Sequence, residues 1–122
     1  MEKWETRIKL KLPGKLFKRN VLFTFEWAAW MIAYDHMNCG LNDFHELPPE
    51  VQVNAVSYGA AVWAATKRGR SAGFTYDDIV SALMHATRGE NMQIGEAMQY
   101  AKQPKWMQAK QAKESDAEEK KS

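Results

Sequence analysis

The strongest constraint on the fold is a strict alternation of residue types near the start of the chain. Even-numbered positions from 4 to 12 carry Trp, Thr, Ile, Leu and Leu, and the odd positions between them carry charged side chains. A period of two is typical of a strand with one buried face. Pro13 and Gly14 then turn the chain, and a second apolar run covers residues 16–25, with polar residues at 18–20. This pattern predicts a β-hairpin whose second strand is bulged or split near Arg19 and Asn20.

The hydrophobic period then changes to that of helices. Apolar residues recur at Trp27, Met31 and Tyr34, at the i, i+4, i+7 spacing of an amphipathic helix that Thr24 can cap. Thr75 and Asp78, three residues later, have the spacing of a capping box at the start of a helix. The expected helices span residues 25–39, 48–66, 76–87 and 91–102, with a connector at 41–47, a basic loop at 67–73 and a break at 88–90.

These elements predict a single α+β domain over residues 1–102. It is mainly helical, and its N-terminal β-hairpin packs on a body of three to four helices. The 122-residue length fits one domain, and the hydrophobic fraction of 45% is enough to build a core. Residues 103–122 are mostly polar, with Trp106 and Met107 as the exceptions, and we expect them to form a mobile tail.

Several classes of protein are excluded by the residue types that the sequence lacks. No run of about 18 apolar residues is present, so we expect no membrane span. The first residues have no apolar stretch typical of a secretory signal. The single cysteine rules out a disulfide framework and fits a reducing compartment.

The positive charge is concentrated at the start of the chain. Residues 1–20 have a balance of +5, whereas residues 21–102 have a balance of −4. The possible basic contact surface comprises Lys9, Lys11, Lys15, Lys18, Arg19, Lys67, Arg68 and Arg70. Such side chains can bind phosphates without reading a base sequence. No nucleic-acid motif accompanies them, and the expected helix at 91–102 has one basic residue, so nucleic acid is not the partner that we expect.

Catalytic and metal-binding patterns are weak. His36, Cys39 and His45 lie within ten residues of one another, but a structural zinc site normally needs four ligands. A Cys–His pair requires an activating environment that a sequence cannot show. The sequence has no nucleophile elbow and no glycine-rich phosphate loop. We therefore expect neither a metal nor a cofactor, and we do not expect an enzyme.

Protein binding is the class that the apolar side chains favour. Five Trp residues are more than one small core needs, and Met is common at surfaces that accept varied apolar partners. Most of the Met residues on the expected helices are nevertheless expected to fill the core. The protein-binding residues that we predict are Trp27, Trp30, Met31, Tyr34, Val56 and Trp63.

The order of these motifs resembles a known family. A charged alternating strand and Pro13-Gly14-Lys15 lead through a second strand into a helix at Leu22–Trp27. Leu47–Glu50 then opens a middle helix, and Phe74–Ile79 opens a later one. Over roughly residues 4–100, this order is similar to that of the small tail assembly chaperones of long-tailed bacteriophages.

The resemblance implies a non-enzymatic protein of the host cytoplasm. Members of this family bind the long, helical tape measure protein and keep it soluble while tail tube subunits polymerise around it. The resemblance implies the tape measure protein as the partner, with the tail tube protein and further copies of this chain as additional candidates. Two alternatives remain open: a structural virion protein, such as a connector or tail-completion subunit, and a nucleic-acid-associated accessory protein that uses the basic hairpin.

Overall fold

The alternating segment forms the first strand of an antiparallel hairpin. The computed structural model describes residues 2–102, in which β1 (Glu5–Leu10) pairs with β2 (Arg19–Thr24). The register places Ile8 opposite Val21, and both side chains are buried, whereas Lys9 is exposed on the other face. The predicted hairpin is confirmed. The second strand begins at Arg19 rather than at residue 16. The predicted bulge is wrong, because the pairing of the two strands is unbroken from Glu5–Thr24 to Leu10–Arg19.

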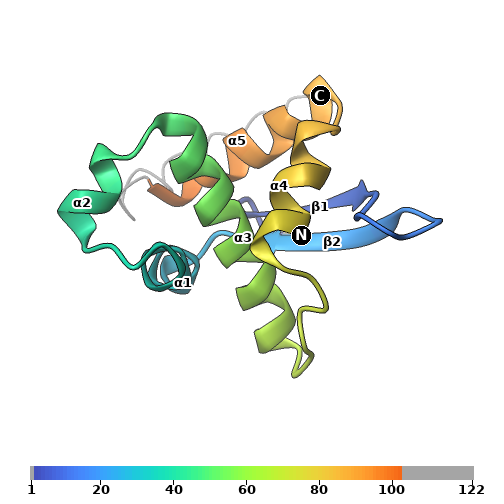
Figure 1. Cartoon of the computed structure of the whole chain (residues 1–122), viewed down its shortest axis with the longest axis horizontal. Coiled ribbons are helices and arrows are strands. Elements are labelled where there is room, and N and C mark those ends of the chain that lie inside the picture. Colours follow the sequence, from blue (N-terminus) through green and yellow to red (C-terminus); the bar gives the residue numbers. More distant parts are fainter. Residues whose placement is uncertain (1, 103–122) are drawn as a thin grey trace, which may run out of the picture.

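Five helices follow the hairpin within the described residues. They are α1 (Trp27–Met37), α2 (Leu41–Glu46), α3 (Pro49–Lys67), α4 (Tyr76–Met84) and α5 (Arg88–Lys102). Figure 1 shows the hairpin on one side of the molecule and α3 in the middle of the molecule. The predicted fold class, a mainly helical α+β domain with an N-terminal hairpin, is confirmed. The predicted tail at 103–122 lies outside the described residues.

Helix α3 is the centre of the packing. It contacts α1, β2 and α4, while α5 packs mainly against β1. Gly59 allows the closest of these approaches, because a Cβ atom there would overlap the Ala29 carbonyl oxygen and lie only 3.3 Å from the Ala33 nitrogen. Ala29 and Ala33 are themselves fully buried. Small side chains thus let α1 and α3 pack backbone to backbone, and the larger Phe23 and Phe25 fill the space beneath the hairpin.

The start of α1 differs from the prediction. Thr24 does not cap the helix: its hydroxyl donates a hydrogen bond to the Glu5 carboxylate across the hairpin, with an oxygen–oxygen distance of 3.0 Å. Glu26 occupies the N-cap position, and its side chain makes no capping hydrogen bond. The carboxylate of Glu26 instead pairs with the Lys67 ammonium at the end of α3.

Two segments that the sequence analysis expects to be irregular are helical in the structure. The expected connector at 41–47 contains α2, because Phe44 is buried and packs edge-to-face on Tyr34 at 4.8 Å between ring centroids. The expected break at 88–90 is the first turn of α5. The Glu90 side chain accepts from the Thr87 backbone N–H at 2.9 Å, and the Thr87 hydroxyl accepts from the Glu90 N–H at 3.2 Å. This reciprocal cap outweighs the flexibility of Gly89.

The capping box predicted for the third helix is confirmed. The Thr75 hydroxyl accepts from the Asp78 backbone N–H at 3.2 Å, and the Asp78 carboxylate accepts from the Thr75 N–H at 2.9 Å. The helix that it opens is shorter than expected and ends at Met84. The chain then needs only three residues to reach the start of α5.

Candidate protein-binding site

Four of the predicted binding residues line one groove. Trp27, Trp30, Met31 and Tyr34 from α1 form it together with the turn at 39–41, His45, and Ala101 and Lys102 at the end of α5. We call it the aromatic groove; its cavity volume is about 760 Å³. Trp27 is 76% exposed, and Leu41, which also lines the groove, is 56% exposed. Large apolar side chains are thus presented to solvent within one concave surface.

The packing of α1 explains this placement. Because Ala29 and Ala33 face α3, the positions between them turn away from it. The Trp30 ring packs against Phe25, with 6.3 Å between ring centroids. The Tyr34 ring packs against Phe44 of α2. Desolvation by burial raises the pKa of the Tyr34 hydroxyl above its usual value. The groove has a fixed inner edge and an exposed outer one.

The remaining two predicted binding residues lie elsewhere. Val56 is only 2% exposed and belongs to the core, so its inclusion in a binding surface was wrong. The helix of Val56 is apolar on more than one side, and the sequence does not show which side meets α1. Trp63 is half-buried near the other end of α3 and does not line the aromatic groove. Its indole nitrogen is buried without a hydrogen-bond partner among the described residues.

The predicted basic surface is partly engaged within the chain. The hydrogen bond with Glu26 raises the pKa of the Lys67 ammonium, which keeps it charged and paired. The Arg19 guanidinium lies over the Phe74 ring, 5.7 Å from its centroid, and the Arg68 side chain donates to the Ala64 carbonyl at 3.2 Å. The other members are exposed: Lys9, Lys11, Lys15, Lys18 and Arg70.

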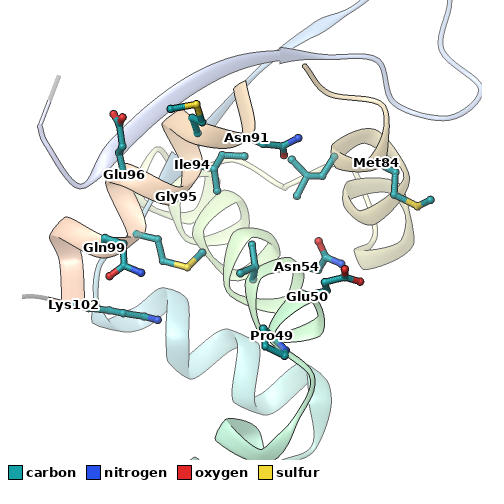
Figure 2. A pocket seen from close by; sticks show the side chains of 14 residues that line it. Pro49, Glu50, Asn54, Met84, Asn91, Ile94, Gly95, Glu96, Gln99 and Lys102 are labelled. Atoms are coloured by element: carbon teal, nitrogen blue, oxygen red, sulfur yellow. The ribbon is translucent and has the colours of Figure 1, made fainter. Parts of the chain in front are cut away.

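A second and larger groove lies between α3, α4 and α5. Its buried floor is formed by Leu83, Ile94 and Met98, and its cavity volume is about 1000 Å³. The exposed apolar side chains around it are Val53 (41%), Met84 (76%) and Met92 (54%). We call this surface the methionine groove, and Figure 2 shows Met84 on its α4 side.

The methionine groove stays open because α5 is held by the hairpin. The Thr6 hydroxyl donates to the Gln93 side-chain oxygen at 3.3 Å, and the Trp4 ring stacks on Tyr100 at 6.3 Å between centroids. These contacts draw α5 toward β1 rather than toward α3. Sequence analysis missed the groove because its walls come from three separate helices. The signal that could have indicated it is Gly95, a helix-weakening residue in the middle of α5.

The residues weighed as metal ligands do not come together. Within residues 2–102, no three His, Cys, Asp or Glu side chains are grouped so that they could hold an ion. The Cys39 thiol donates to the Met37 carbonyl at 3.3 Å. The His36 ring packs against Tyr58 and Tyr76, with centroids 5.0 and 4.6 Å away. Across the same residues, no helix combines the length and the apolar character needed to cross a bilayer.

Comparison with known proteins adds no relative. No protein-family model, no curated protein and no solved structure matches this chain. The fold class alone does not assign a function, because unrelated functions share the same architectures. Any functional argument therefore depends on the surfaces of this chain, above all on its two apolar grooves.

Proposed function

We propose that this protein is a tail assembly chaperone of a long-tailed bacteriophage, acting without catalysis in the host cytoplasm. Its client is the tape measure protein, which it keeps soluble while the tail tube polymerises. Two lines of support converge on this proposal. One is the resemblance in the order of sequence motifs from the hairpin to Phe74–Ile79. The other is the aromatic groove.

The observation that carries the proposal is the exposure of Trp27 and Met31 in a preformed groove. Trp27 is 76% exposed and Met31 is 43% exposed, on the same side of α1 as two half-buried aromatic rings. Leaving such side chains in water costs roughly 25 cal/mol for each Å² of apolar surface, and a bound apolar segment removes that cost. Exposed patches of this kind mark interaction sites in small proteins.

The size of the groove suits reversible binding. A chaperone must release its client when the tail tube closes around it, so each contact must be of modest strength. The groove volume of about 760 Å³ lies within the range of roughly 300–1,000 Å³ of ligand pockets, so the groove can take one short apolar segment of a client. Many such weak contacts along a long helical client would keep it soluble without trapping it.

The test is mass spectrometry of two samples from phage-producing cells: a pull-down with the tagged full chain, and the purified particles. We expect the tape measure protein in the pull-down and no copy of this chain in the particles. The double variant Trp27→Ser/Met31→Ser should lose the client. The matched control is Leu16→Ser, because Leu16 is 88% exposed in the hairpin loop and far from the groove in sequence.

Other outcomes separate the alternatives. A stoichiometric amount of this chain in the particles would identify a structural virion protein and overturn the proposal. Recovery of nucleic acid, lost steeply as the salt concentration rises, would favour the accessory protein that uses the basic hairpin. Capture of the tape measure protein that Trp27→Ser/Met31→Ser leaves unchanged would remove the aromatic groove from the argument.

A further inference from the structure

We propose that the methionine groove is a second docking site, which binds an amphipathic helix of a partner protein whose apolar face is bordered by Lys or Arg. This inference goes beyond the proposed function, because it concerns a different surface and specifies the chemistry of its ligand. It holds or fails independently of what occupies the aromatic groove.

The shape of the methionine groove fits a helix. α5 lines it from Asn91 to Lys102, a length of roughly 16 Å at 1.5 Å per residue, or about three helical turns. The opposite side is formed by the first turns of α3 and by the end of α4 (Figure 2). A trough walled by helices, with a buried apolar floor, is the usual receptor for the apolar face of a partner helix.

Gly95 is the observation that points to a missing partner. It lies in the middle of α5, where glycine weakens a helix relative to alanine. Gly59 has a reason inside the chain, since α1 fills the place of its side chain. Gly95 has none among the described residues, because a Cβ atom there would meet nothing within 4 Å, although the residue lines the groove. A helix in the groove could approach the α5 backbone closely at this point.

The charges around the groove select a basic helix. Glu50 lies on the α3 wall and Glu96 on the α5 wall, and both are exposed (Figure 2). Lys102 is the one basic residue among the lining side chains, and it lies at the end of α5. Lys or Arg residues that border the apolar face of a bound helix would meet acids on both walls, whereas Asp or Glu would be repelled.

The side chains at the mouth of the groove favour a ligand of adaptable shape. Met84 and Met92 are unbranched and polarizable, so they can repack around different apolar residues. The floor beneath them belongs to the packed core, since Ile94 is 2% exposed and Met98 is 4% exposed. This combination of a fixed base and movable edges is suited to recognising an apolar stripe rather than one exact sequence.

The test is fluorescence anisotropy of a labelled 18-residue designed peptide, titrated with the full chain. The probe has Leu along one helical face and Lys along the other. Two matched peptides keep the length: one replaces every Lys with Glu, and one replaces a central Leu with Pro. We expect the Lys peptide to bind at least about tenfold more tightly than either of the others, because they lose the charge match or the helix.

Variants of the chain locate the site. Met84→Ser/Met92→Ser and Gly95→Leu should each weaken binding of the Lys peptide by about tenfold, through lost apolar contact and through steric blocking respectively. Glu50→Gln/Glu96→Gln should weaken it several-fold and flatten its salt dependence. Trp27→Ser and Leu16→Ser are the controls, and both should bind within a factor of about two of the unaltered chain.

Three results would overturn the proposal. The first is equal binding of the Lys and Glu peptides, and the second is loss of binding in Trp27→Ser but not in Gly95→Leu. The third comes from sedimentation velocity: a self-associated chain that Met84→Ser/Met92→Ser renders monomeric would show that a second copy occupies the groove. Because these results concern the peptide alone, they are distinct from failure of tape measure capture in phage-producing cells.

Discussion

The two glycines in the middle of α3 and α5 differ in the space around them. Gly59 faces α1, where the backbones are so close that a Cβ atom would lie 3.0 Å from the Ala29 carbonyl carbon. Gly95 faces the methionine groove, where a Cβ atom would meet nothing within 4 Å among the described residues. The same residue type therefore completes one interface inside the domain and leaves another surface open. The meaning of a helical glycine is set by what lies opposite it.

The largest effect on the free energy of unfolding is expected for Gly59→Ala. The added methyl group collides with the backbone of α1 rather than with a movable side chain, so the two helices must separate. We expect a loss of about 3 kcal/mol or more in the free energy of unfolding. Chemical denaturation followed by circular dichroism measures this loss. A variant with an unchanged unfolding midpoint would contradict the close approach of α1 and α3.

A smaller loss is expected for Thr87→Ala. This variant removes the hydroxyl that accepts from the Glu90 N–H and frees the first turn of α5, one wall of the open groove. The expected cost is about 1 kcal/mol, as for other N-caps. Thr66→Ala is the matched control, because its hydroxyl donates to the Val62 carbonyl within α3 at 2.9 Å rather than capping a helix start. Equal unfolding midpoints for the two variants would argue against the cap.

Gly95→Ala should shift stability in the opposite direction. Alanine restricts the unfolded chain and favours the helix, and the structure offers room for its methyl group. We expect a gain of about 0.5–1 kcal/mol in the free energy of unfolding. The comparison with Gly59→Ala is direct, since the substitution is identical and the sign is reversed. A loss of stability in Gly95→Ala would mean that α5 packs more closely than described.

The smallest effect concerns pH. Two interactions with Thr87 lower the pKa of the Glu90 carboxyl below its usual value. The larger is the hydrogen bond from the Thr87 backbone N–H, and the smaller involves the Thr87 hydroxyl. The folded state therefore favours the charged form. The stabilisation that the Glu90 carboxylate gives to the folded state is complete above the pKa that Glu90 has in the unfolded chain. It is lost as the pH falls through the lower pKa of Glu90 in the folded state. Glu90→Gln should be less stable than the unaltered chain at neutral pH, and the gap should narrow in acid.

Denaturation of these two proteins at several pH values measures the gap. A difference that stays constant from neutral to acidic pH would show that the carboxylate charge does not contribute. Glu96→Gln is a suitable control, because Glu96 is exposed on the same helix, whereas the cap at its start is made by Glu90.

The sequence predicted local structure better than it predicted the sites. Alternation alone placed β1, and the spacing of Thr75 and Asp78 located the start of α4. α2 was missed because its cause is not local: Phe44 is buried only when Tyr34 is nearby. The groove residues on α1 follow from helical spacing, but the opposite edge comes from Ala101 and Lys102, some seventy positions later.

The burial of individual residues was harder to foresee. Val56 and Met92 are both apolar helix residues, yet Val56 is 2% exposed and Met92 is 54% exposed. Helical periodicity shows that a helix has an apolar face, but not whether a neighbour covers it. The difference depends on α5 being drawn toward the hairpin by Gln93 and Tyr100, which no pattern within α5 reveals.

The contact between the first strand and the last described helix has a consequence for biosynthesis. Thr6 and Gln93 are 87 positions apart, so a ribosome has translated most of the chain before this hydrogen bond can form. Until then one surface of β1 has no lasting neighbour, although the strand itself was made first. Closure of the domain therefore waits for the emergence of α5. A pause in translation before Arg88 would prolong the period in which the nascent hairpin is open to aggregation or to proteases.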